Sequence, residues 1–198
     1  KVMPGMKRAY NFAKEHRAIG LGVLGYHSLL QSKLVEFDSL QAKALNHEIF
    51  KTLKERSEAA SRELSETAGI QCIREGYANT TLIAIAPTKS SSFILGQVSM
   101  GIEPIKSNYF IKDLAKSKTI YKNPFLECEL DKYGLNTFEV WEDILKKDGS
   151  VQHLDFPTKG VFKSFIEISP KEIILQAAQR QKFIDQSQSL NLMLHPSI

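Results

Sequence analysis

The sequence predicts a helix-rich α/β fold, and three observations support this prediction. The segment 80–86 is apolar and β-branched without alternation, which is typical of a strand buried on both faces. Several longer segments repeat apolar residues at helical spacing between capping residues and glycines. These elements alternate with no linker or low-complexity tract between them, which favours a parallel sheet or barrel covered by helices, in a single domain over residues 1–198.

The first part of the chain contains one short strand and two helices. A glycine-containing strand is expected over 17–23, followed by a helix over 24–33. A long amphipathic helix is expected over 39–68, with Asp38 as its N-cap and Gly69 as its C-terminal stop. Its predicted apolar face carries Leu45, Ile49, Leu53, Ala60 and Leu64.

The middle of the chain is predicted to continue the alternation. Pro87 closes the strand 80–86, and residues 90–98 can form a helix. A second strand is expected over 108–114. Asn123 followed by Pro124 is typical of a helix start, in this case of a helix that ends near Gly134.

Two further helices and a strand are predicted in the last third. Asn136 is the expected cap of a helix that extends to Gly149, with a buried stripe of Phe138, Trp141, Ile144 and Leu145. The run from Ser169 to Glu172 is a capping box with proline at the first helical position, and the helical residues Ile173, Ala177, Gln181 and Ile184 follow it. A strand is expected over 190–194.

Composition and charge exclude several classes of protein. The net charge of +4 is spread along the chain, which argues against a nucleic-acid partner, and no apolar run approaches the roughly 20 residues that span a bilayer. Cys72 and Cys128 are far apart and outside any CxxC spacing, so neither a disulfide framework nor a thiolate zinc site is indicated. These features favour a reducing, cytoplasmic setting.

The other titratable residues show no pattern of a metal or catalytic site. The five histidines, at positions 16, 27, 47, 153 and 195, lack ligand spacing, and His47 is expected to lie among polar neighbours on the long helix. Glu127, Glu129 and Asp131 are expected to spread around the surface of their helix. We therefore predict no metal ligand and no cofactor held by this chain.

Gly20-Leu21-Gly22-Val23-Leu24-Gly25 matches the GxGxxG pattern of dinucleotide sites, in which glycines let the backbone approach a pyrophosphate. Asp38 lies downstream, where such a site places an acid. The preceding Lys14-Glu15-His16-Arg17 is charged, however, and leaves little room for a buried first strand. Close packing of the backbone is therefore the favoured interpretation, and cofactor binding is the alternative.

The segment Pro87-Thr88-Lys89-Ser90-Ser91-Ser92 is the best candidate binding site. It lies where a buried strand is predicted to turn into a helix, so free backbone N–H groups, hydroxyls and one ammonium would converge. Helix capping alone explains one or two of these side chains but not the whole run. The residues predict a phosphate site at Pro87, Thr88, Lys89, Ser90 and Ser91.

Three motifs stand out along the chain: Ala86–Ser92, Gly101-Ile102-Glu103-Pro104, and the run from Gln181 to Ser187. Together they resemble the large subunit of aerobic (class I) ribonucleotide reductase. The segment from Arg17 to Val23 is similar to an Arg-x-x-Gly-x-Gly segment upstream of them in that family. The similarity covers about residues 17–196.

The resemblance implies a fold and a ligand. The family is built on a ten-stranded α/β barrel, of which this chain would supply later strands and covering helices. The family binds the phosphates of nucleoside diphosphates with the loop that corresponds to Thr88, Lys89, Ser90 and Ser91. The family often has an acidic residue where Lys89 stands, so backbone donors are the safer prediction at that position.

The resemblance also implies what the chain lacks. The radical thiol of the family lies in an Asn-x-Cys-x-Glu loop, whereas Arg74 and Leu130 stand two residues after Cys72 and Cys128. No two of the six tyrosines are adjacent, although the family relays its radical through an adjacent pair. We therefore expect no catalytic residue here. The expected partners are the remainder of the large subunit and a radical-generating, metal-containing small subunit, and a homodimer stays open.

Three hypotheses follow. The first is that the parent protein reduces ribonucleoside diphosphates to deoxyribonucleotides by thiyl-radical chemistry, with this chain holding the diphosphate and inactive alone. The second is a non-catalytic nucleotide- or phosphate-binding α/β module. The third is a structural assembly fragment, whose exposed strand edges would need a partner.

Overall fold

The computed structural model describes residues 3–114 and 117–194, which form two compact units. Unit 1 combines the chain up to Gly22 with Leu45–Ala86 and Gln176–Ser189. Unit 2 combines Val23–Ala44, Pro87–Leu175 and the residues from Leu190 onward. The organisation as a single domain remains a prediction.

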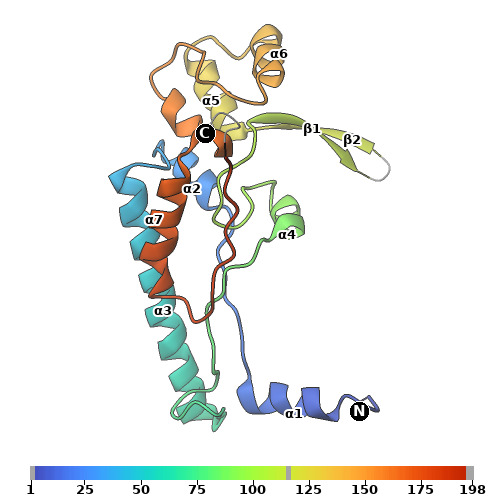
Figure 1. The fold of residues 1–198 in the computed structure, drawn as a ribbon, viewed down its shortest axis with the longest axis vertical. Helices are drawn as coiled ribbons and strands as arrows, with labels where there is room; N and C mark the ends of the chain where they lie inside the picture. The colour runs from blue at the N-terminus through green and yellow to red at the C-terminus, as the bar shows by residue number, and fades with distance from the viewer. Residues whose placement is uncertain (1–2, 115–116, 195–198) are drawn as a thin grey trace. The chain divides into compact units, whose positions relative to one another are not determined.

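Unit 1 is built on three helices, α1 (Lys7–His16), α3 (Leu40–Ala68) and α7 (Pro170–Gln181), of which α3 and α7 also contribute residues to unit 2. The end of α7 lies beside α3 (Figure 1), where Asn46 Nδ2 donates to the carbonyl of Gln176 at 3.1 Å and to Oε1 of Gln179 at 2.7 Å. Helix α1 was not predicted from the sequence, and it contributes no buried residue.

The bounds of α3 agree with the prediction, but its buried face does not. The side chains of α3 that are buried in unit 1 are Asn46, Phe50, Ser57, Ser61 and Ser65. The predicted face is half-buried at Leu45, Ile49 and Leu53 and exposed at Ala60 and Leu64. The reason is a close approach of the chain: the amides of Ala78 and Asn79 donate to the carbonyl and Oγ of Ser61, at 3.0 and 3.1 Å. Small hydroxyl side chains leave room for that backbone.

The predicted strands at 17–23 and 80–86 lie side by side without forming a regular sheet. Leu21 and Ile83 form an isolated parallel bridge, with the Leu21 amide 2.7 Å from the carbonyl of Leu82 and the Ala84 amide 3.0 Å from that of Leu21. The parallel direction agrees with the prediction, but the regular strands were wrong. Each of these segments has one ladder partner among the described residues, and that pairing is a single bridge.

Within unit 1, Asp185 also forms hydrogen bonds with the segment 80–86. Its Oδ2 accepts hydrogen bonds from the amides of Leu82 at 2.8 Å and Ile83 at 3.0 Å. Its Oδ1 accepts from Nζ of Lys54 on α3 at 2.5 Å. Partial burial raises the pKa of Asp185, but the Lys54 hydrogen bond and the two amides outweigh it, so the pKa lies below its usual value.

Unit 2 contains the short helix α2 (Tyr26–Ser32), the helix α4 (Lys89–Ile94), and the pair α5 (Pro124–Lys132) and α6 (Phe138–Lys146). The predicted cap of α5 is confirmed, since Asn123 Oδ1 accepts from the Phe125 amide at 3.1 Å. Two predicted caps were displaced by one residue. Ser39 caps α3 in place of Asp38, and Thr137 caps α6 in place of Asn136.

The displaced residues make tertiary hydrogen bonds instead. Oδ2 of Asp38 lies 2.9 Å from Nζ of Lys163, and Oδ1 of Asn136 accepts from the indole N–H of Trp141 at 2.6 Å. A helix amide and a second donor compete for the same side-chain oxygen, and the hydroxyl of the neighbouring residue accepts from the amide instead.

The core of unit 2 is one apolar cluster around α5 and α6. It consists of Leu126, Leu130, Trp141, Ile144, Val151, Phe156, Val161 and Phe162. Trp141 and Ile144 were predicted to be buried, whereas Phe138 and Leu145 of the same predicted stripe are 72% and 37% exposed. The short 3-10 helix η1 (Lys159–Phe162) contributes the last two residues of this cluster, and η2 (Phe165–Glu167) follows it in the chain.

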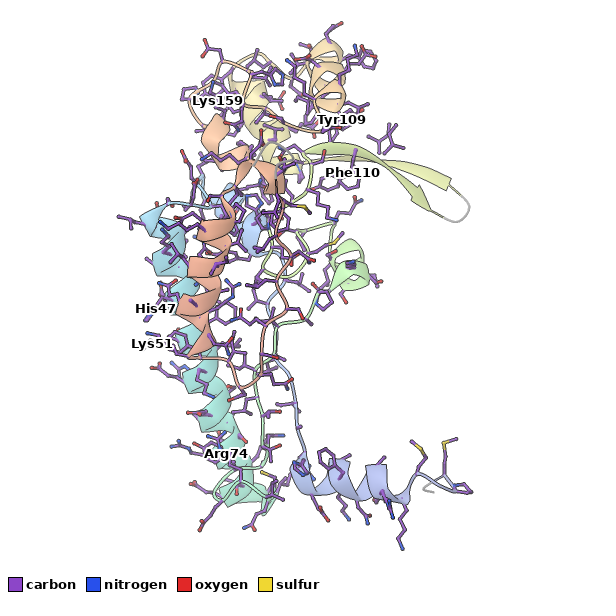
Figure 2. The ribbon with its side chains drawn as sticks, in the orientation of Figure 1. His47, Lys51, Arg74, Tyr109, Phe110 and Lys159 are labelled. Atoms are coloured by element: carbon purple, nitrogen blue, oxygen red, sulfur yellow. The ribbon has the colours of Figure 1, made fainter. Side chains whose placement is uncertain are left out.

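The sheet of unit 2 is a hairpin of β1 (Tyr109–Leu114) and β2 (Ser117–Lys122), paired antiparallel with Tyr109 opposite Lys122 (Figure 1). The strand predicted at 108–114 is therefore present, but its partner was missed and the pairing is not parallel. Tyr109 lies at the α6 end of the hairpin, with its ring 5.3 Å from that of Trp141 (Figure 2).

The prediction of a helix-rich chain is confirmed. Residues 190–194 lie outside any strand, contrary to the prediction, and the described residues contain one two-stranded sheet but no ten-stranded barrel. No helix in the described part of the chain is both long enough and apolar enough to cross a bilayer.

Candidate phosphate-binding loop

The loop predicted to bind phosphate lies in unit 2, at the start of α4. The side chains of Pro87, Lys89, Ser90 and Ser91 are exposed and that of Thr88 is half-buried. The loop is therefore open to a ligand over most of its length. Helix α4 is shorter than the predicted 90–98, because it ends at Ile94.

The first turn of α4 leaves backbone donors free of helical partners. The Ser92 amide is the first to donate within the turn, to the carbonyl of Thr88 at 3.0 Å. The amides of Lys89, Ser90 and Ser91 therefore have no acceptor inside the helix, as is general for a first turn. Amides, two serine hydroxyls and the Lys89 ammonium together form a set of donors suited to an anion.

Ser92 does not belong to this donor set. Its side chain is buried, and its Oγ donates to the carbonyl of Lys89 at 2.9 Å. The hydroxyl run of the sequence thus divides into exposed residues that can meet a ligand and one residue that serves the helix itself.

Thr88 has a different role from that of a normal N-cap. Its backbone is left-handed, with φ 43° and ψ 33°, and its hydroxyl makes no capping bond to α4. Instead Oγ1 accepts a hydrogen bond from the Gly101 amide at 2.8 Å. This bond joins two motifs that the sequence analysis noted separately, and sequence reasoning assigned no role to Gly101.

The Gly101 segment is itself hydrogen-bonded to the first residues of α2 and to the residue before it. The Gly25 amide donates to the carbonyl of Ser99 at 2.9 Å, and the Tyr26 amide donates to that of Gly101 at 3.2 Å. Ser28 and Ser99 exchange amide-to-hydroxyl bonds of 3.1 and 2.9 Å. Both serines are buried, so these hydrogen bonds that support the loop lie in the interior of unit 2.

The contacts of the glycines favour packing over a dinucleotide site. A Cβ on Gly20 would lie 3.0 Å from Cβ of Ala84, and one on Gly22 would lie 3.0 Å from the Ala84 carbonyl oxygen. Gly25 takes a positive φ of 77°. Asp38, the candidate acid of such a site, is paired with Lys163. Close approach of the backbone therefore accounts for these glycines, as the sequence analysis favoured.

The two cysteines are both free and lie in different environments. Cys72 Sγ is engaged with local backbone: it lies 3.2 Å from the Tyr77 carbonyl oxygen and 3.3 Å from the Arg74 amide nitrogen, which donates to it. Cys128 is exposed on α5. No group of three or more His, Cys, Asp or Glu side chains capable of holding a metal occurs among the described residues.

Two titratable residues depart from the sequence expectations. Glu129 is buried, contrary to prediction, and it accepts from the Thr158 hydroxyl at 2.9 Å and pairs with Lys132. His47 contacts an aromatic ring rather than polar neighbours alone: it lies edge-on to Phe183 at 5.1 Å and projects from α3 (Figure 2).

His27 is fully buried in unit 2. Its Nδ1 accepts a hydrogen bond from the Ile105 amide at 3.0 Å. Burial lowers the pKa of His27 to about 3, against a smaller opposite effect of the hydrogen bond with the Val161 backbone. The imidazole is therefore neutral and structural.

A comparison with known protein families assigns this chain to one of them. The family model described as "Ribonucleotide reductase, barrel domain" matches residues 4–74 and 68–198. The chain belongs to the ribonucleotide reductase barrel-domain family. This confirms the resemblance noted from the sequence motifs.

Individual relatives of the barrel-domain chain agree with that assignment. It is 40% identical to the ribonucleoside-diphosphate reductase large subunit of Invertebrate iridescent virus 3, over 98% of this chain and 32% of that protein. It is 32% identical to the large subunit of Caenorhabditis elegans, over 97% of this chain and 29% of that protein. The barrel-domain chain thus spans about a third of the length of these relatives.

A solved structure shows the same fold. The class Id ribonucleotide reductase alpha subunit of Actinobacillus ureae is 55% identical, with a TM-score of 0.91, over 100% of the barrel-domain chain and 37% of that subunit. The arrangement of helices and extended segments described above is therefore a part of a larger subunit fold in that relative.

Proposed function

We propose that the chain is part of a large subunit that reduces ribonucleoside diphosphates to deoxyribonucleotides, and that Pro87, Thr88, Lys89, Ser90 and Ser91 hold the substrate diphosphate. The observation that carries the proposal is the exposed first turn of α4, in which Ser90 and Ser91 are exposed and three amides have no acceptor inside the helix. The names of the relatives, all ribonucleoside-diphosphate reductase large subunits, give the substrate class.

In this proposal the residues of this chain bind and orient the substrate diphosphate. The amides of Lys89, Ser90 and Ser91 donate to phosphate oxygens, and the Ser90 and Ser91 hydroxyls add two further donors. Lys89 supplies a positive charge at the edge of the loop. The thiyl-radical chemistry belongs to residues outside this chain, consistent with the backbone-bonded Cys72 and the exposed Cys128.

The same proposal assigns partners and architecture. The extended segments near Leu21 and Ile83 would be strands of a ten-stranded barrel completed by the remainder of the large subunit. In this proposal a metal-containing small subunit generates the radical. Two large subunits can form a homodimer, and the assembly is cytoplasmic. This chain holds no cofactor in the proposal.

Substitution of Ser90 by proline tests the loop in the complete large subunit. Ser90→Pro removes one amide and one hydroxyl at the second helical position, where proline is tolerated because that amide has no helical partner. We expect the KM for a nucleoside diphosphate to rise roughly tenfold or more, since a charge-assisted donor is lost. Ser90→Ala, which keeps the amide, should raise the KM less.

A matched control separates binding from folding. Lys171→Pro introduces proline at the same helical position of α7 and should leave the KM unchanged. The affinity for the unphosphorylated nucleoside should be the same in all variants. Equal KM values for wild type and Ser90→Pro would overturn the assignment of the loop.

A further inference from the structure

We infer that Thr88 is a positioning residue, whose hydroxyl fixes the phosphate loop by accepting the hydrogen bond from Gly101, and that direct contact with phosphate belongs to the residues after it. The inference rests on the proposed function, because it explains how that loop is held. It also gives the motif Gly101–Pro104 a role, as the support of the loop.

The backbone of Thr88 needs an external support. A φ of 43° is unfavourable for an L-residue, and most of all for a β-branched one, whose Cβ crowds the following carbonyl. Such conformations persist where surrounding contacts determine them, and they concentrate at ligand sites. The hydroxyl of Thr88 is turned to Gly101 at 2.8 Å instead of capping α4, so this bond is the contact that determines the turn.

Gly101 is a suitable anchor because it is buried and fixed. Its positive φ of 56° suits glycine, and its carbonyl accepts from the Tyr26 amide at 3.2 Å. Ser99, two residues earlier, is bonded to Gly25 and Ser28. A displacement of Thr88 would therefore leave a buried Gly101 amide without its acceptor, which is unfavourable.

The Thr88 backbone in turn sets the direction of the donors. Its carbonyl accepts the first helical bond of α4, from Ser92 at 3.0 Å. The three amides between these residues therefore follow the orientation of the Thr88 peptide. A change at Thr88 alters the placement of every phosphate donor, although the side chain itself is half-buried and already engaged.

The test uses the reconstituted enzyme with Thr88→Val, Thr88→Ser and Gly101→Ala. Thr88→Val keeps the shape but removes the acceptor, and we expect the KM for nucleoside diphosphate to rise roughly tenfold with kcat within about twofold. Thr88→Ser, which keeps the hydroxyl, should restore a KM near that of wild type. Inhibition by the unphosphorylated nucleoside should not change.

Gly101→Ala distinguishes positioning from direct contact. It strains the anchor at a position with positive φ and removes no side chain that could meet phosphate, yet we expect it to raise the KM as Thr88→Val does. The double variant should resemble the more severe single variant, because both break the same bond. Additive effects of the two substitutions, or a wild-type KM for Gly101→Ala, would overturn the inference.

Failure of the proposed function has a different signature. If the loop does not bind the diphosphate at all, Ser90→Pro and Thr88→Val both leave the KM unchanged. If the loop binds but Thr88 is itself a phosphate ligand, Ser90→Pro and Thr88→Val raise the KM while Gly101→Ala does not.

Discussion

At the scale of single residues, His27 shows how burial turns a titratable group into a pH-dependent contribution to stability. The imidazole is fully buried, edge-on to Phe37 at 5.3 Å, with Nδ1 occupied by the Ile105 amide and Nε2 3.5 Å from Nε2 of Gln31. Protonation would place a charge in this apolar setting and would remove the acceptor for Ile105.

The sign of the pH effect follows from the lowered pKa. The pKa of His27 is about 3 in the fold against 6.5 as the ordinary value, so the unfolded chain binds a proton between these limits and the folded chain does not. We expect the His27 contribution to be intact above pH 6.5 and to fall by up to about 1.4 kcal/mol per pH unit as the pH drops toward 3. Urea unfolding of the 198-residue chain at several pH values measures it.

His27→Asn, which can still accept from Ile105, should flatten this slope. His47→Gln serves as the control and should keep it. An unchanged slope in His27→Asn would contradict the assignment to this residue.

Asp185 gives a second prediction at this scale. Its carboxylate is the shared acceptor for the Leu82 and Ile83 amides and Lys54 Nζ, with its side chain 14% exposed. We expect Asp185→Ala to lower the free energy of unfolding by about 2 kcal/mol, because it leaves two amides without their acceptor and Lys54 with its ion pair to Glu58 alone. Asp185→Asn, which keeps one oxygen, should cost less in the same urea titration. A loss below that of exposed Gln186→Ala would contradict this account.

At the scale of elements, the close approach between the segments 17–22 and 80–86 makes a prediction with an internal control. A Cβ on Gly20 meets the Cβ of Ala84, whereas a Cβ on Gly22 meets the carbonyl oxygen of the same residue. Gly20→Ala should destabilise the chain by about 1–3 kcal/mol. Adding Ala84→Gly should recover most of that loss, because it removes the atom in contact.

Gly22→Ala should cost at least as much and should not be recovered by Ala84→Gly, since the backbone oxygen remains. Thermal unfolding of the four variants measures both effects. Recovery of Gly22→Ala by Ala84→Gly would contradict the geometry.

The elements also show which features the sequence could predict. The start of α5 is local, because Asn123 and Pro124 act on their own backbone, and it was predicted correctly. The buried face of α3 depends on a distant segment: Ser61 lies inward because Ala78 and Asn79 bind it, and neither its polarity nor its spacing indicates this. The antiparallel partner of β1 was missed because pairing is likewise non-local.

The candidate site likewise has one feature that the sequence could predict and one that it could not. The loop Pro87–Ser91 was found because its hydroxyls and cation follow an apolar segment directly in sequence. The bond between Thr88 and Gly101 spans 13 residues and depends on a left-handed backbone, which the residue type threonine argues against. A non-local hydrogen bond that stabilises an unfavourable backbone conformation leaves no periodic pattern in the sequence, so it could not be predicted from one.

At the scale of the whole molecule, apolar side chains remain on the outside of the described residues. Met6, Tyr10 and Phe12 of the α1 region are 52%, 48% and 60% exposed, and Ile94 at the end of α4 is 84% exposed. The chain spans about a third of the large subunits to which it is similar. Surfaces of this kind promote association in an isolated chain.

We therefore expect the isolated chain to self-associate in a concentration-dependent way, as sedimentation velocity can measure. Met6→Glu with Tyr10→Glu should reduce the associated fraction, because charge replaces exposed apolar area. Thr67→Glu with Ala68→Glu, at exposed positions without large apolar side chains, is the matched control and should not reduce it. A monomer at every concentration would contradict the prediction.

The isolated bridge between Leu21 and Ile83 also affects how fast the chain can fold. The pairing around it joins residues as far apart as Ile19 and Thr81, which are separated by 62 positions. Closing so long a loop has a large entropic cost before any contact compensates for it, whereas α3, which lies between the two segments, can form from local contacts alone. Helix formation should therefore precede this pairing, and the pairing should limit the rate at which unit 1 reaches its native state.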